Sequence, residues 1–189
     1  MRHRVFIAIN LPENIKKKLA DFQGRWPEIP ARWTKKDNLH ITLIFLGYLS
    51  DNELLEVCKI TKETASRNFS FPVNLNKVIC APPKKIPPRM VWAEGEKSKE
   101  FTALKNDLEK SLLISNGVRF SPESRAFSPH ITLARIRAFE WKRLEPEARP
   151  EINEEISLSF QAESIEVMES QLKRGGAEYT ILESCQLKI

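Results

Sequence analysis

Cysteine is scarce in this chain of 189 residues, which contains only Cys58, Cys80 and Cys185. The three cysteines are far apart, odd in number and show no C-x-x-C spacing, so they give no support to a zinc clip or a dithiol redox site. Such cysteine usage is typical of a protein from a reducing interior. We therefore expect a cytoplasmic protein.

Long apolar runs and nucleotide-binding loops are also missing. The N-terminus, MRHRVFIAINLPENIKKK, has an apolar run of only five residues before a polar residue and a proline. Such a run is too short for the core of a signal peptide or for a membrane span. The sequence contains no G-x-x-x-x-G-K-S/T loop for a nucleotide and no serine or cysteine nucleophile motif. We expect no membrane partner, no metal and no cofactor.

The composition is that of an ordinary globular protein, with 41% hydrophobic and 29% charged residues. At this length we expect one domain, residues 1–189, which can contain two lobes. The net charge of +5 mildly favours a phosphate or polyanion partner. Basic residues form short clusters in residues 16–18, in residues 32–36, and at Lys84–Lys85 with Arg89. A solvated surface explains each cluster equally well.

The first part of the chain is expected to alternate strands and helices. The segment RVFIAINLP is typical of a buried strand, and Pro12 then opens a helix with Ile15, Leu19 and Phe22 on one face. NLHITLIFLG (residues 38–47) predicts a second strand that closes at its glycine. Asp51 follows as the expected N-cap of another helix.

The second part predicts more strands around one helix. FPVNLNKVICA and RMVWAEGE are expected to be strands joined by a proline-rich loop. A helix is expected from Ser98 to Ser115, with Gly117 as its C-cap. FSPHITLARI (residues 127–136), ISLSFQAESIEVMESQL and EYTILESCQLKI complete the strands, and Gly175–Gly176 signals a turn between the last two. This mixed order predicts an α+β fold with antiparallel sheets.

Two of the three histidines lie in the same tetrapeptide, HITL, within two of these expected strands. Side chains alternate between the two faces of a strand. His40 and Thr42 should therefore share one face, as should His130 and Thr132, while the intervening aliphatic residues point the other way. If the two strands lie side by side, two imidazoles and two hydroxyls surround one point.

This set of side chains suits phosphoryl chemistry without a metal. The hydroxyls can donate to non-bridging phosphate oxygens, while one imidazole takes a proton from the nucleophile and the other protonates the leaving oxygen. A pKa of about 6.5 leaves both forms of histidine available near neutral pH. A zinc site has less support, because no cysteine, aspartate or glutamate lies at ligand spacing beside the histidines. One H-x-T strand alone is better explained by an inert histidine, and the repetition favours catalysis.

The paired H-x-T-L strands, together with FIAINLP near the start and VMESQL near the end, resemble the two-histidine phosphoesterases. Within them, the chain resembles the branch of RNA 2′,3′-cyclic phosphodiesterases first named 2′-5′ RNA ligases, and the matching segments are spread over nearly the whole chain. The resemblance implies an α+β fold, with a bilobal, pseudo-twofold arrangement of two antiparallel sheets flanked by helices. It also implies an active-site cleft between the lobes. Separately, we expect a monomer.

The resemblance implies catalysis by His40 and His130, with Thr42 and Thr132 on the phosphate. We expect His40 to be the acid and His130 the base. Family members open a terminal 2′,3′-cyclic phosphate on RNA to leave a 2′-phosphate, and some show weak, reversible, ATP-independent 2′-5′ joining. Arg135 matches a family position that contacts phosphate. Strict alternation would turn Arg135 toward the core, so a bulge or the strand end must bring it to the site.

Two other functions stay open. No residue of the HITL motif recognises a base or the length of an RNA chain, so the substrate could be another cyclic or 2′-5′-linked nucleotide. A nucleic-acid or nucleotide-binding module without turnover is a different class, although the presence of both histidines and both threonines argues against it. The aromatic residues that could stack a base beside the phosphate are Phe6, Trp33, Trp92 and Phe127.

Overall fold

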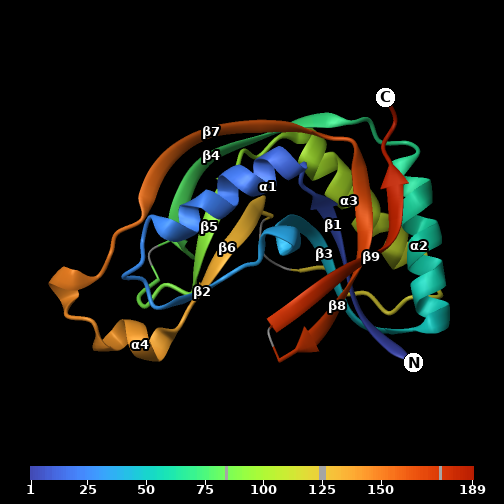
Figure 1. The fold of residues 1–189 in the computed structure, drawn as a ribbon. Coiled ribbons are helices and arrows are strands. Elements are labelled where there is room, and N and C mark those ends of the chain that lie inside the picture. The colour runs from blue at the N-terminus through green and yellow to red at the C-terminus, as the bar shows by residue number, and fades with distance from the viewer. Residues whose placement is uncertain (84, 124–126, 175) are drawn as a thin grey trace.

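In the computed structural model, which describes residues 1–83, 85–123, 127–174 and 176–189, the main feature is a nine-stranded sheet (Figure 1). Its strands are β1 (Arg2–Asn10), β2 (Ala31–Trp33), β3 (His40–Ser50), β4 (Phe71–Ala81), β5 (Met90–Gly95), β6 (His130–Ile136), β7 (Asn153–Ala162), β8 (Ser164–Lys173) and β9 (Gly176–Gln186). They lie in the order β7-β4-β5-β6-β3-β1-β8-β9, and β2 pairs with β6 outside this path. The strand pairs are antiparallel, which confirms the expected α+β class.

The sheet consists of two halves that meet at the two HITL strands. β3 and β6 are paired at one position, Ile41 with Ile131. The other neighbours along the path pair over four or more positions, as β1 and β8 do. The expected two sheets are therefore two halves of one hydrogen-bonded sheet, joined at its weakest point. The pseudo-twofold relation between the halves stays a prediction.

The two longest helices pack on the sheet, and the described residues contain four α-helices in all. They are α1 (Glu13–Ala20), α2 (Asp51–Ala65), α3 (Lys99–Ile114) and α4 (Ala138–Arg143), with short 3-10 turns η1 (Asp21–Gly24), η2 (Lys36–Asn38) and η3 (Pro146–Ala148). The expected stripe on α3, Phe101 with Leu104, Leu108 and Leu112, is buried, because residues three or four apart share one face of a helix. α2 packs beside α3, close to β9 (Figure 1).

Several predicted boundaries were wrong by a few residues. The strand does not end at Gly47. β3 continues to Ser50 and contains Gly47, which has a φ of 79°. Ser50, not Asp51, is the N-cap of α2. Gly117 is not a C-cap, because α3 is followed directly by Ser115, whose extended conformation needs no glycine. Of the predicted features, Lys84 in a basic cluster and Gly175 in the last turn lie outside the described residues.

Two short elements were not predicted. β2 has only three residues and directly follows Pro30, and α4 has only six residues. Such short segments show too little periodicity to be recognised from sequence. Among the helices of the described residues, none is long and apolar enough to cross a membrane.

A capping box begins α2. The Glu53 backbone N–H donates to Ser50 Oγ at 3.4 Å, and the Ser50 backbone N–H donates to the Glu53 carboxylate at 2.8 Å. These bonds satisfy two donors that the first turn of a helix otherwise leaves free. The box therefore fixes the corner where β3 turns into α2.

Ser50→Ala removes the oxygen that caps α2, so we expect the free energy of unfolding to fall by about 1 kcal/mol. Urea denaturation followed by circular dichroism measures this change. Ser66→Ala is the matched control at the other end of α2, where the hydroxyl donates to the Glu63 carbonyl at 2.8 Å. A loss for Ser66→Ala as large as that for Ser50→Ala would contradict the capping role.

Candidate active site

The two HITL strands form the floor of a cleft of about 750 Å³. The five residues predicted from sequence all line it, namely His40, Thr42, His130, Thr132 and Arg135. The expected alternation holds, because the intervening Ile41 and Ile131 are fully buried on the opposite face. The contact between β3 and β6 thus places both H-x-T pairs in one cavity.

A β-bulge in β6 brings Arg135 into the cleft. Along the pairing of β5 with β6, Val91 faces Ala134 but Trp92 faces Thr132, so Leu133 is an extra residue. Leu133 and Ala134 are both buried, and the alternation restarts one residue later. Arg135 consequently lies on the same face as His130, as the predicted bulge requires.

β3 contains the matching bulge, and it exposes a residue that sequence reasoning missed. Ile7 of β1 faces Ile44 while Ala8 faces Thr42, so Leu43 is the extra residue. Phe45 lies five residues after its histidine, as Arg135 does, and also lines the cleft. Its side chain is 58% exposed. The shared spacing was the signal in the sequence that could have identified it.

Backbone hydrogen bonds fix the orientation of both imidazoles. His40 Nδ1 lies 2.7 Å from the Asn38 carbonyl oxygen, and His130 Nδ1 lies 2.8 Å from the Ser128 carbonyl oxygen. Since a carbonyl oxygen can only accept, each Nδ1 must carry the proton and donate. Nε2 is then the atom that gains or loses a proton, and in the neutral ring of His40 it accepts from the Thr42 hydroxyl at 3.0 Å.

Aromatic rings hold the histidines in place. Trp92 of β5 stacks on His130, with ring centroids 3.8 Å apart and planes 24° apart. Phe6 and Tyr179 contact His40 at centroid distances of 4.9 and 5.1 Å. Phe6 is buried, so it supports the histidine and offers no open face.

The other two aromatic candidates lie apart from the histidines. Phe127 lines the cleft next to α3, where Lys105 Nζ lies 5.6 Å from the ring centroid. Trp33 belongs to β2 and is not among the described residues that line the cleft.

The electrostatic environments of the two histidines differ. Burial lowers the pKa of His40 to about 4, against the opposing effect of the Asn38 carbonyl, and the positive charges of Lys16 and Arg135 act in the same direction as burial. Burial also lowers the pKa of His130, but there the Ser128 carbonyl and the carboxylates of Glu94 and Glu123 oppose it. Both pKa values therefore favour neutral imidazoles at pH 7, and His130 is the easier to protonate.

The basic side chains that line the cleft come from outside the predicted clusters. The basic side chains among its described lining residues are Arg4, Lys105 and Arg135. Lys16 is buried instead, and its Nζ donates to the Asp37 carbonyl at 3.4 Å, while Lys36 pairs with Glu13. The described basic residues of the predicted clusters therefore do not line the cleft.

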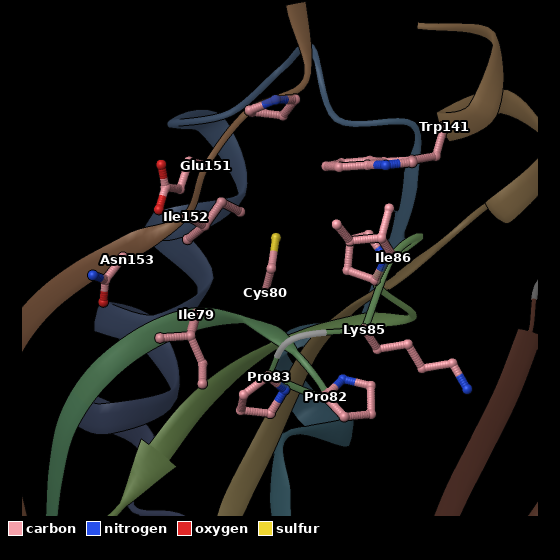
Figure 2. A pocket seen from close by; sticks show the side chains of 12 residues that line it. Ile79, Cys80, Pro82, Pro83, Lys85, Ile86, Trp141, Glu151, Ile152 and Asn153 are labelled. Carbon is pink, nitrogen blue, oxygen red and sulfur yellow. The ribbon is translucent and has the colours of Figure 1, made fainter. Parts of the chain in front are cut away.

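A second, smaller pocket of about 330 Å³ lies away from the histidines, between the proline-rich loop and α4 (Figure 2). Apolar side chains such as Ile86, Ile152 and Trp141 enclose it, and the Cys80 sulfur points into it. The three cysteines are free thiols. Among the described residues, no group of three or more histidine, cysteine, aspartate and glutamate side chains could hold a metal ion.

Lowering the pH should protonate the three histidines in a fixed order, which NMR of the ring Cε1–H signals can follow. The hydrogen bonds from Asp51 and Glu169 raise the pKa of His3, so it should titrate first, above pH 6.5. His130 should follow below pH 6.5, and His40 should titrate last, near pH 4. Single His→Ala variants assign the signals, and a pKa for His40 above that of His130 would refute this description of the cleft.

Comparison with known proteins places the chain in a family. The LigT-like phosphoesterase model matches residues 9–92 and 95–179. The RNA 2′,3′-cyclic phosphodiesterase of Thermus thermophilus is 28% identical, over 98% of this chain and 90% of the relative, and that of Aeropyrum pernix is 32% identical, over 82% and 85%.

Solved structures agree with this assignment. The crystal structure of TT0787 of Thermus thermophilus aligns with a TM-score of 0.82 at 28% identity, covering 97% of each chain. Escherichia coli LigT complexed with 3′-AMP aligns with a TM-score of 0.76 over all of both chains, and at 24% identity it supports the fold alone. The chain therefore belongs to the LigT-like phosphoesterase family, within the two-histidine phosphoesterase superfamily.

Proposed function

We propose that this protein hydrolyses terminal 2′,3′-cyclic phosphates of RNA to 2′-phosphates, with His40 and His130 as the acid and base and without a metal. The observation that carries the proposal is the convergence of two imidazoles, two hydroxyls and one guanidinium on one cleft. Relatives of similar length named RNA 2′,3′-cyclic phosphodiesterase give it further support.

The reaction needs one proton removed and one proton supplied. In the proposed mechanism, His130 Nε2 takes a proton from water as the water attacks phosphorus, and His40 Nε2 protonates O3′ as its bond to phosphorus breaks. The Nδ1 bonds to backbone carbonyls keep both Nε2 atoms directed to the cleft. The 2′-phosphate remains on the RNA.

The hydroxyls and the guanidinium bind the charge that develops on phosphate. Thr42 Oγ1 is 3.0 Å from His40 Nε2 in the empty cleft, and it can turn to a non-bridging oxygen once substrate is bound. Thr132 holds the equivalent place beside His130, and Arg135 supplies a planar donor pair for phosphate oxygens. Phe45 presents an exposed ring to the same cleft and is suited to stack the terminal base.

In this mechanism, the charge of the bound substrate favours protonation of His40 and so makes it an acid. With its pKa near 4, His40 is mostly neutral in the empty cleft at pH 7. The negative charge of the bound cyclic phosphate favours the imidazolium and raises this pKa. With the 5′-hydroxyl of a second RNA in place of water, the same groups can catalyse a weak, reversible 2′-5′ joining, in which the O5′–P bond forms, the P–O3′ bond breaks, His130 takes the hydroxyl proton and His40 protonates O3′. We further propose that the protein acts in the cytoplasm as a monomer.

Protein treated with EDTA should convert a short RNA ending in a 2′,3′-cyclic phosphate into the 2′-phosphate product, which chromatography against standards identifies. His40→Ala and His130→Ala should each lower turnover by roughly 10² to 10⁴, because each removes a positioned acid or base. His3→Ala is the control, since this histidine binds Asp51 and Glu169 and does not line the cleft. Loss of activity with EDTA and its return with zinc would rule out the mechanism, as would near wild-type turnover in either cleft variant.

The acid and base can be distinguished with a substrate that carries sulfur in place of O3′. A thiolate leaves with little protonation, so this substrate should restore turnover to His40→Ala, which lacks the acid, and not to His130→Ala. Rescue of His130→Ala instead would reverse the assignment. A 3′-phosphate product from the normal substrate would show that the RNA docks the other way round.

A further inference from the structure

The cleft extends past the histidines along β1 and β8, to a place where a second phosphate can bind. Arg4 and Ser170 both line this part of the cleft. β1 pairs with β8 from Ala8 opposite Glu166 to Val5 opposite Glu169, so Arg4 and Ser170 follow at the next position of the same register. Both belong to the face that carries Phe6 and Met168.

Ser170 has a hydroxyl without a partner. The residue is only 9% exposed, and its Oγ accepts or donates no hydrogen bond within the described residues. Buried hydroxyls in proteins are normally hydrogen-bonded, because an unpaired one loses the bonds it makes to water. The oxygen itself is buried, so a turn of the Ser170 side chain about χ1 would bring it to a ligand oxygen in the cleft.

Arg4 is exposed, and no carboxylate of the described residues pairs with it. On the opposite face of the same strands, His3 Nδ1 and Glu169 lie 2.8 Å apart, so the acidic neighbour is already engaged elsewhere. The guanidinium therefore faces the cleft with its donors free, and its planar fork suits two phosphate oxygens.

Tyr179 connects this place to the catalytic histidine. It pairs with Ser170 across β8 and β9, and its ring contacts that of His40 at a centroid distance of 5.1 Å. The lining of the cleft is thus continuous from His40 through Tyr179 to Ser170. A chain bound at the histidines can follow it.

We infer that Arg4 and Ser170 form a subsite for an internal phosphodiester group of the RNA, upstream of its cyclic end. Ala8 faces Thr42 across β1 and β3, and Arg4 lies four residues farther along β1. At about 3.3 Å per residue this is about 13 Å along the strand. Because side chains stand roughly perpendicular to a sheet, the Arg4 guanidinium is offset from Thr42 by a similar distance, which is too far for one phosphate group to touch both. The inference rests on the proposed function, because it takes the cyclic phosphate to lie at the histidines.

Three substrates separate this subsite from the catalytic one. The first is a mononucleoside 2′,3′-cyclic phosphate, which has no internal phosphate. The second is a short oligoribonucleotide with the same cyclic end, and the third is that oligonucleotide with uncharged methylphosphonate groups at its internal positions. We expect Arg4→Gln to lower kcat/KM for the charged oligonucleotide about 10-fold more than for the mononucleotide, because it removes a charge-assisted bond that only the longer substrate makes.

With the wild-type protein, kcat/KM for the methylphosphonate substrate should be lower than for the charged oligonucleotide by the same factor. With Arg4→Gln, the two substrates should have the same kcat/KM. Ser170→Ala should give a smaller loss with the same dependence on internal charge. Arg143→Gln is the matched control, because this exposed arginine lies on α4 outside the cleft. Equal effects of Arg4→Gln on all three substrates would overturn the inference, and so would a wild-type protein that does not distinguish charged from uncharged linkages.

A binding experiment tests the subsite even if the protein does not hydrolyse these substrates. Fluorescence anisotropy of a labelled oligonucleotide ending in a 2′-phosphate measures its affinity for the wild type, Arg4→Gln and Arg143→Gln. The subsite is supported if only Arg4→Gln binds the charged oligonucleotide more weakly than the wild type, and if this difference in affinity disappears when the internal linkages are uncharged. This outcome supports the subsite even if no cyclic phosphate is hydrolysed. Unchanged binding together with normal hydrolysis would refute the subsite and leave the proposed function in place.

Discussion

The contact between β3 and β6 determines the position of the candidate active site. These strands pair at Ile41 and Ile131 alone, and both side chains are fully buried. Because side chains alternate along a strand, burying these two isoleucines turns His40 and His130 to the opposite face together. A shift of one residue in either strand would send a histidine into the apolar core, so core packing and the active site share one constraint.

The repeat in the sequence continues as a repeat in geometry. Each HITL segment is followed by a bulge, with Leu43 and Leu133 as the extra residues. The two bulges bring the residue five positions after each histidine into the cleft, and these residues differ. Arg135 gives one half of the cleft a positive charge and Phe45 gives the other an apolar ring, so two similar strands present different side chains to one cleft.

Local patterns were sufficient to predict most strands, the apolar stripe of α3 and the shared face of His40 with Thr42. Together with the family resemblance that pointed to Arg135, they also indicated that a bulge or the strand end had to turn it into the cleft. They did not reveal β2, α4 or the joining of two half-sheets at one residue pair, because these depend on partners far away in the chain. Phe45 was missed for a related reason, since strict alternation would place it in the core, and the bulge that exposes it follows from the register of β1. Likewise, an unpaired hydroxyl such as that of Ser170 is visible only once its surroundings are known.

The two histidines have the same local motif but different electrical surroundings. Lys16 and Arg135 disfavour a positive charge on His40, whereas Glu94 and Glu123 favour one on His130. In the proposed mechanism, the acid must therefore acquire its proton as the anionic substrate arrives, because the phosphate supplies the negative charge that the cleft lacks near His40. Substrate binding and proton uptake are coupled in this scheme, so each strengthens the other. The protein then holds a competent acid only when there is a leaving oxygen to protonate.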